Sequence, residues 1–182
     1  STGFGKTHLT QSIGNGIKKQ NPNRRVQYVS SEKFATDYVN SLQNNRVGEF
    51  KDKYRKHDVL IMDDIQFLVG KEKTQEELFH LYNALYENNK QIIFSSDKHP
   101  NYINGLEDRL KSRFGSGMIV EITMPDYESR LAILREKLKQ QQVIIPDEVV
   151  HYIAETIQAS IRELEGTLNL VVCQSQLKNK PL

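Results

Sequence analysis

The sequence predicts an α/β unit with a largely parallel sheet, followed by a small helical lid. Short apolar runs of strand length alternate with segments of helical periodicity as far as Pro125. This alternation is typical of a parallel sheet flanked by crossover helices. Beyond Pro125 only helical patterns remain. We therefore expect the α/β unit to cover residues 1–125 and the lid to cover residues 126–182.

Four segments have the length and composition of strands. They are aliphatic or β-branched, are bounded by turn or polar residues, and cover residues 25–30, 59–62, 91–95 and 118–122. The helical segments show apolar residues at three- and four-residue spacing. Those of the α/β unit cover residues 6–19, 31–42, 47–54, 74–88 and 106–114, and those of the lid cover 127–141, 147–156 and 161–177. Ser160 is placed to cap the last helix.

Composition excludes several classes of protein. Charged residues make up 26% of the 182 residues and hydrophobic residues 37%, which are ordinary values for a soluble globular chain. No stretch approaches the roughly 18 apolar residues of a membrane-spanning helix, and residues 1–6 lack the apolar core of a secretory signal. We therefore expect a cytoplasmic protein. The net charge is only +2, so a nucleic-acid role would depend on local basic patches.

The only cysteine, Cys173, lies in an apolar helical run. It has no second cysteine for a disulfide and no neighbouring ligands for a metal site. We expect it to be a small core residue.

Glycines near the start of the chain predict a phosphate-binding loop. Gly3 and Gly5 precede Lys6 and Thr7 at the start of a helical pattern, as in the second half of G-x-x-x-x-G-K-T, whose first glycine would stand before Ser1. Glycines let backbone N–H groups turn toward phosphate oxygens, and a helix N-terminus favours their negative charge. Lys6 is then expected to contact the β- and γ-phosphates and Thr7 to hold Mg²⁺, with His8 also at the nucleotide. An ordinary helix N-terminal turn is the alternative.

A second motif supports this interpretation. The apolar run at residues 59–62 ends in Asp63 and Asp64, as a Walker B strand does. Ligands bind at the carboxyl edge of such sheets, so Asp63 is expected to bind Mg²⁺ and Asp64 to position or polarise the attacking water. Aspartates also cap helices after strands, and that alternative stays open.

The strand ending at Ser95 is followed by Ser96 and Asp97. A polar side chain here could reach the γ-phosphate or the attacking water, and Asp97 is our candidate for this sensor 1 position. A simple Ser-Asp turn would give the same pattern.

Three arginines are candidates for phosphate contacts. Arg109 and Arg113 are four residues apart and share one helical face, where an arginine at a subunit edge could reach a neighbour's nucleotide. Arg162, which opens the last helix, could reach the γ-phosphate within its own chain. Solvated helix faces, or an ion pair of Arg162 with Glu163 or Glu165, are the alternatives.

Longer strings identify a family. The strings are DDIQFL at residues 63–68, TQEELFH at 74–80, NALYE at 83–87 and RELEG at 162–166. Together with the two nucleotide motifs, these strings resemble the ATP-binding module of bacterial DnaA replication initiators, and the resemblance covers essentially the whole chain. The resemblance implies an AAA+ P-loop NTPase fold, ATP or ADP with Mg²⁺ as ligands, and a weak ATPase whose hydrolysis acts as a switch.

The resemblance also implies roles for other residues. Arg113 matches an arginine finger acting in trans, Arg109 a second arginine at the same oligomer interface, and Arg162 sensor 2. The helical pair at residues 31–54 matches an initiator-specific element that promotes an ATP-dependent helical oligomer. Single-stranded origin DNA would contact Val39, Lys71, Lys73 and Thr74. From the residues alone, Lys71 and Lys73 form a plausible phosphate-contacting loop, but without the resemblance a solvated loop is the favoured interpretation.

The expected partners are thus origin DNA, which the oligomer would open, and further copies of the chain, in a nucleoid-associated setting. The family's inner strand before the phosphate loop, its domain that recruits the replicative helicase or its loader, and its duplex-reading domain are expected outside this sequence. Alternative functions are an AAA+ helicase loader, a DnaA-related regulatory ATPase, a small-molecule kinase, or a scaffold that has lost nucleotide binding.

Overall fold

The computed structural model describes residues 5–178, which form two compact units. One unit is Lys6–Val120, and the other contains Gly5 and residues 121–178. The placement of a domain boundary at residues 125 and 126 stays a prediction.

The first unit is built on a parallel sheet, as predicted. Among the described residues the sheet has three strands, β1 (Val26–Ser30), β2 (Val59–Asp63) and β3 (Gln91–Phe94), in the order β1-β2-β3. The register places Ser30 beside Asp63 and Met62 beside Phe94. The carboxyl ends of the strands therefore meet at one edge of the sheet.

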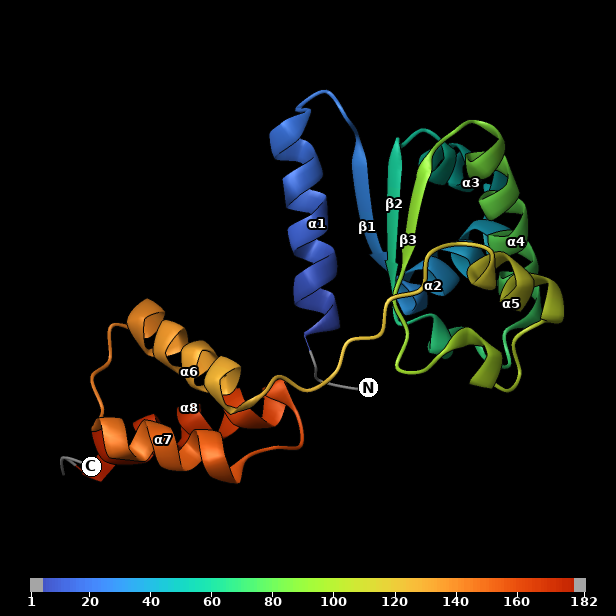
Figure 1. Cartoon of the computed structure of the whole chain (residues 1–182). Helices are drawn as coiled ribbons and strands as arrows, with labels where there is room; N and C mark the ends of the chain where they lie inside the picture. Colours follow the sequence, from blue (N-terminus) through green and yellow to red (C-terminus); the bar gives the residue numbers. More distant parts are fainter. Residues whose placement is uncertain (1–4, 179–182) are drawn as a thin grey trace. The chain divides into compact units, whose positions relative to one another are not determined.

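Helices cover both faces of this sheet (Figure 1). Helix α1 (Lys6–Gln20) lies on one face. The other face carries α2 (Ser31–Gln43), α3 (Val47–Arg55), α4 (Glu72–Glu87) and α5 (Asp108–Gly115). Two short 3₁₀ turns, η1 (Ile65–Leu68) and η2 (Pro100–Tyr102), follow the ends of β2 and β3.

Side-chain alternation along β2 decides which residues face the site. Leu60 and Met62 are buried in the core that the sheet shares with α2–α5. Ile61 points to the opposite face, where its Cδ1 would be only 3.0 Å from a Cβ added at Gly14 of α1. Glycine at position 14 thus lets α1 approach the sheet closely. Because successive side chains in a strand alternate, Asp63 lies on the α1 face with Ile61.

The fourth predicted strand is absent from the structure. Residues 118–122 form neither a helix nor a strand, and Met118 is 93% exposed. An apolar β-branched run becomes a strand only when a neighbouring edge satisfies its backbone N–H and C=O groups. Among residues 5–178, the sheet consists of β1, β2 and β3, and residues 118–122 are not one of its strands.

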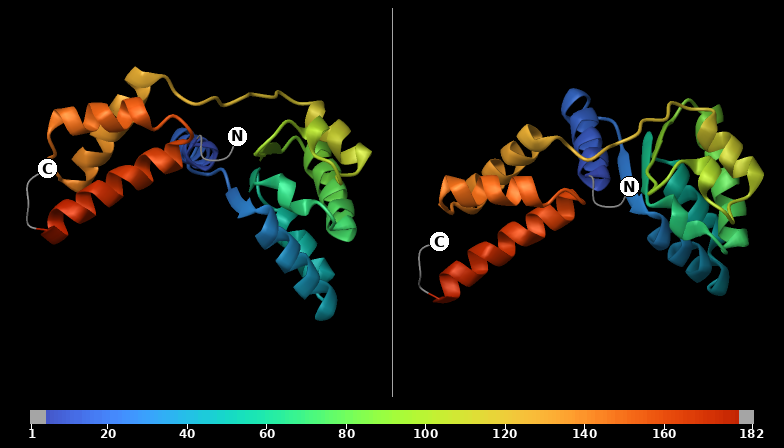
Figure 2. Two further views of the ribbon diagram at one scale, coloured as in Figure 1. Left: turned by 90° about the horizontal axis from the view of Figure 1, so that it is seen from below. Right: turned by 60° about the horizontal axis from the view of Figure 1, so that its bottom comes forward.

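The second unit is a three-helix cluster with a core of its own. It consists of α6 (Tyr127–Gln141), α7 (Asp147–Thr156) and α8 (Ile161–Lys178), which pack against one another (Figure 2). Leu134, Ala154 and Leu168 are fully buried in it. Ser160 caps α8 as predicted, because its Oγ accepts a hydrogen bond from the Glu163 N–H at 3.0 Å.

The prediction for Cys173 was wrong, because its side chain is exposed. The buried stripe of α8 is Leu164, Leu168 and Val172, at four-residue spacing, and Cys173 is one position beyond this stripe. No helix in residues 5–178 is long and apolar enough to cross a membrane.

Candidate functional site

The loop-to-helix junction at Gly5 and Lys6 has the local features of a phosphate-binding loop. Gly5 has a φ of +88°, a left-handed conformation that glycine adopts without steric cost. Lys6 is the first residue of α1. Its Nζ is buried and has no hydrogen-bond partner in the described part of the chain. A buried ammonium without a partner is costly, so the position suits an anionic ligand. Gly3 lies outside the described residues, and His8 is exposed.

Hydroxyl groups from three elements converge on the Asp63 carboxylate at the end of β2. Thr7 Oγ1 of α1 donates a hydrogen bond to Asp63 Oδ2 at 2.7 Å, and the Tyr28 hydroxyl of β1 donates to the same oxygen at 2.6 Å. Ser95 Oγ, directly after β3, donates to Asp63 Oδ1. The predicted pair Thr7 and Asp63 is therefore in direct contact across 56 residues of sequence.

This environment keeps Asp63 ionised. Burial by itself raises its pKa, but the hydrogen bonds from Ser95, Tyr28 and Thr7 and the charge of Lys6 outweigh burial, so the pKa is lower than usual. The hydrogen bond between Tyr28 and Asp63 has the opposite effect on the pKa of Tyr28. Burial and the hydrogen bond to Asp63 raise the pKa of Tyr28 to about 12. An ionised carboxylate beside a threonine hydroxyl is a donor set that suits Mg²⁺.

Asp64 is held in an unusual backbone conformation beside this carboxylate. Its φ of 58° and ψ of 53° are left-handed, which is uncommon for a residue other than glycine. Hydrogen bonds on both sides hold it there. The Ser31 hydroxyl donates to the Asp64 carbonyl at 2.6 Å, and the Asp64 N–H donates to Ser95 Oγ at 3.1 Å. Such conformations are concentrated at functional sites.

Gln66 links Asp64 to the candidate sensor 1 residue. Its Nε2 donates to Asp64 Oδ1 at 3.2 Å, and its Oε1 accepts from the Asp97 N–H at 3.4 Å. The structure therefore brings Lys6, Thr7, Asp63, Asp64 and Asp97 to one edge of the sheet. Their catalytic roles stay predictions.

Sequence reasoning missed Tyr28, Gln66 and the hydroxyl of Ser31 as parts of this site. Tyr28 of β1 pairs with Ile61 of β2 in the register, and Asp63 follows Ile61 by two residues on β2. A long side chain there reaches the carboxylate diagonally. Without the strand register, a tyrosine in an apolar run is indistinguishable from a core residue.

The two arginines of α5 are exposed, and both contact one aromatic ring. The Cζ of Arg109 lies 4.6 Å from the centre of the Phe79 ring, and the Cζ of Arg113 lies 5.5 Å from it. Arg109 Nε also donates to Glu107 Oε2 at 2.6 Å. Arg113 is thus not buried within its own chain.

Arg162 lies in the other unit, as the second residue of α8, and is exposed. The alternative of an ion pair with Glu163 or Glu165 is absent among the described residues, where Glu165 instead pairs with Lys137 at 3.7 Å. The sensor 2 role of Arg162 remains a prediction.

The residues predicted to contact single-stranded DNA line one groove of about 530 Å³. Val39 and its neighbours on α2 form one wall, and residues 70–74 form the other. Val39 is 45% exposed, and Lys71 and Lys73 are exposed as well. Our expectation of a basic loop was partly wrong, because Lys73 lies in the first turn of α4. A helix N-terminus offers backbone N–H groups to an anion in addition to the lysines.

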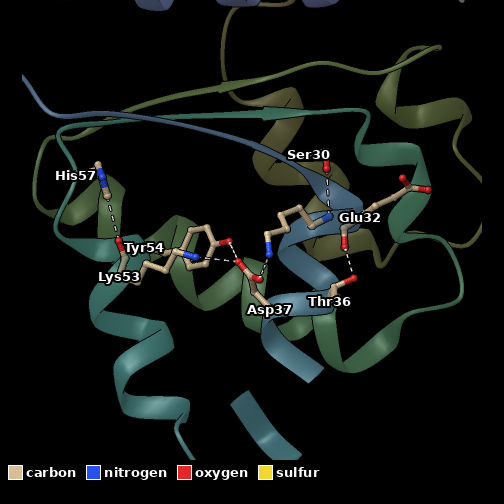
Figure 3. Close-up of polar contacts among 8 residues, drawn as sticks. Ser30, Glu32, Thr36, Asp37, Lys53, Tyr54 and His57 are labelled. Atoms are coloured by element: carbon tan, nitrogen blue, oxygen red, sulfur yellow. Dashed lines mark hydrogen bonds and ion pairs between the residues drawn. The ribbon is translucent and has the colours of Figure 1, made fainter. Parts of the chain in front are cut away.

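A cluster of polar contacts fastens α2 to α3, the predicted initiator-specific pair (Figure 3). Asp37 of α2 accepts hydrogen bonds from Lys53 at 3.0 Å and from the buried Tyr54 hydroxyl at 2.8 Å, both on α3. Lys33, one turn earlier on α2, pairs with the same carboxylate at 2.7 Å. Burial raises the pKa of Asp37, but the hydrogen bonds from Lys33, Lys53 and Tyr54 outweigh it, so the pKa is lower than usual.

Comparisons with known proteins agree with this geometry. The family model described as the bacterial DnaA ATPase domain matches residues 1–121. Domain III of DnaA from Thermotoga maritima superimposes with a TM-score of 0.96 and is 40% identical, covering 100% of this chain and 76% of that one. DnaA bound to AMPPCP and single-stranded DNA is 42% identical, with a TM-score of 0.84, covering 98% of this chain and 56% of that one. AMPPCP-bound DnaA from Aquifex aeolicus is 44% identical, with a TM-score of 0.84, covering 96% and 54%.

The fold is therefore that of an AAA+ P-loop NTPase, as predicted. More specifically, the chain belongs to the bacterial DnaA ATPase-domain family. It spans little more than half of the two nucleotide-bound relatives.

Proposed function

We propose that this chain is the ATP-binding module of a bacterial replication initiator. ATP with Mg²⁺ would bind at the edge of the sheet formed by Lys6, Thr7, Asp63 and Asp64, and slow hydrolysis would return the module to an ADP state. The observation that carries the proposal is the buried Lys6 ammonium, which has no hydrogen-bond partner among the described residues, beside a carboxylate that is kept ionised. A triphosphate would neutralise the Lys6 ammonium, and Mg²⁺ would neutralise the Asp63 carboxylate.

The roles of the individual residues follow from the contacts. Gly5, Lys6 and the N-terminus of α1 would hold the phosphates, with Gly3 and His8 beside them. Thr7 and Asp63 would coordinate Mg²⁺, which screens the phosphate charge. Asp64 would orient the attacking water, and Gln66 would hold Asp64 and Asp97 in a fixed relation through its two hydrogen bonds. Arg162 would contact the γ-phosphate as sensor 2.

We further propose that ATP drives assembly into a helical oligomer that engages and opens origin DNA in the cytoplasm, on the nucleoid. Arg109 and Arg113 are exposed, so an adjacent copy could present its nucleotide to them. The groove lined by Val39, Lys71, Lys73 and Thr74 would hold single-stranded DNA, as a relative with a bound strand supports. Each copy adds a few basic contacts, so the affinity grows with the number of copies. The replicative helicase or its loader would be recruited elsewhere in the protein.

ATP titration of the wild-type chain and of Lys6→Ala tests the proposal. We expect Lys6→Ala to weaken Mg·ATP binding on the order of 10- to 100-fold, because a charge-assisted contact is lost from a buried position. Lys18→Ala, on the exposed part of the same helix, should bind as the wild type does. No measurable nucleotide binding by the wild-type chain would contradict the proposal.

A second measurement addresses DNA. Fluorescence anisotropy with a labelled single strand should show ATP-dependent binding that is lost in Lys71→Ala and Lys73→Ala. Lys51→Ala on α3 serves as the charge-matched control, because Lys51 does not line the groove. Equal losses in all three variants would indicate a non-specific effect of net charge.

A further inference from the structure

Phe79 of α4 contacts both arginines of α5 and is assigned no role in the function proposed above. The distances from its ring centre, 4.6 Å to the Arg109 Cζ and 5.5 Å to the Arg113 Cζ, lie within the roughly 6 Å reach of a cation–π contact. Phe79 itself is partly buried and packs against the main core. One anchored ring therefore touches two exposed guanidinium groups.

The two guanidinium groups differ in their other contacts. Arg109 is paired with Glu107 through its Nε at 2.6 Å. Arg113 is in none of the ion pairs of residues 5–178, and its guanidinium contacts the Phe79 ring. Its N–H groups remain available to an anion, because the ring offers only its π face. A carboxylate partner would instead neutralise Arg113 and compete with a phosphate.

Gln75, one turn before Phe79 on α4, fixes the junction between α4 and α5. It is fully buried, and its Oε1 accepts a hydrogen bond from the Glu107 N–H at 2.9 Å, just before α5 begins. Its Nε2 donates to the carbonyls of Leu68 and Gly105 at 2.8 and 2.9 Å. Residues four apart share one helical face, so Phe79 follows Gln75 along the side of α4 that meets α5.

We infer that Phe79 is a positioning residue that holds the Arg113 guanidinium ready for the phosphate chain of a nucleotide bound by an adjacent copy. The inference rests on the proposed function, in which Arg113 acts in trans. A free arginine side chain samples many rotamers, and ordering them opposes binding. The ring restricts these rotamers before the neighbour arrives, without using the N–H groups that the phosphate needs.

Phe79→Leu tests the inference, because leucine keeps an apolar side chain in the core but has no π face. We expect Mg·ATP-dependent self-association, measured by sedimentation velocity, to weaken roughly two- to fivefold at each interface. The affinity of the single chain for ATP should not change. Phe79→Tyr keeps the ring and should assemble as the wild type does. Phe79→Trp should also assemble, because its larger ring packs differently but is the strongest partner for a cation–π contact, and a role in packing alone would not predict this. Tyr86→Leu, an exposed ring on the same helix, is the matched control and should assemble as the wild type does.

Arg113→Ala distinguishes a failure of the inference about Phe79 from a failure of the proposed role of Arg113 in trans. If Arg113→Ala weakens assembly while Phe79→Leu matches the wild type, the inference about Phe79 fails and the proposed function stands. If Arg113→Ala assembles normally, the role of this arginine in trans fails, and the inference fails with it. A drop in ATP affinity of the single chain in Phe79→Leu would also overturn the inference, since it would indicate a structural effect on the chain's own site.

Discussion

Ser95 is the residue on which the geometry of the two acids depends most directly. Its hydroxyl donates to Asp63 Oδ1 and also accepts the N–H of Asp64, so one side chain connects both predicted acids to the end of β3. Ser95 is only 8% exposed, and water is poorly placed to replace it. Without this hydroxyl, a buried carboxylate oxygen and a backbone N–H would each lose a partner.

Ser95→Ala should therefore destabilise the chain by about 1–3 kcal/mol, the usual cost of leaving a buried polar group without a partner. Urea denaturation followed by circular dichroism measures this difference. Ser96→Ala is the control, since Ser96 is less buried and, among residues 5–178, its hydroxyl only accepts the Lys98 N–H, at 3.4 Å. Equal losses in the two variants would show that the contact with Asp63 contributes nothing particular to stability.

Among the elements, the three strands are linked at their starts by Asp58, which directly precedes β2. Its Oδ2 accepts the backbone N–H of Arg25 at 2.8 Å, just before β1, and its Oδ1 accepts Lys90 Nζ at 3.2 Å, just before β3. The backbone N–H of Gln91 donates to the Asp58 carbonyl at 3.0 Å. The hydrogen bond from the Arg25 backbone, followed by that from Lys90, lowers the pKa of Asp58 to about 2.

This pKa predicts how stability depends on pH. The folded-state pKa of Asp58 is about 2, against about 3.9 for an unfolded aspartate. A lowered pKa contributes stability that is present above the unfolded value and is lost as the pH falls through the folded value. The difference in free energy of unfolding between the wild type and Asp58→Asn should be constant above about pH 5 and shrink as the pH falls from about 4 toward 2. Denaturation at a series of pH values measures it, and a difference that does not change with pH would contradict the assigned pKa.

At the scale of the whole molecule, two separate cores support the chain. The core of the sheet unit includes Leu60, Met62 and Leu110, whereas that of the helical unit includes Leu134, Leu164 and Leu168. Each unit buries its own apolar residues, so we expect the stability of a helix or strand to depend on the core of the unit to which it belongs.

Leu168→Ala tests this division. Removing a fully buried leucine costs about 2–5 kcal/mol, and we expect amide hydrogen exchange to speed up in α6, α7 and α8 while the amides of the sheet keep their protection. Leu170→Ala is the matched control, because Leu170 is on the same helix but 60% exposed. Equal loss of protection in β2 and α8 would show that the two units unfold as one.

Local patterns were enough to predict most elements of this chain. Apolar runs predicted four strands, of which three form the parallel sheet, and three- and four-residue spacing predicted each of the eight α-helices of residues 5–178 within a few residues. The strings DDIQFL and RELEG indicated the family that the comparisons identify. These features are local because hydrogen bonding and side-chain periodicity within an element depend on neighbours in sequence.

What the sequence determined by itself was the order of elements, the family and the acids at the end of β2. Only the tertiary structure decided that residues 118–122 form no strand, that Tyr28 reaches Asp63 and that Phe79 lies against two arginines. The physical reason is the same in all three cases. Strand pairing and side-chain contacts join residues far apart in the chain, and the register between elements, which packing of the whole core sets, decides which of them meet.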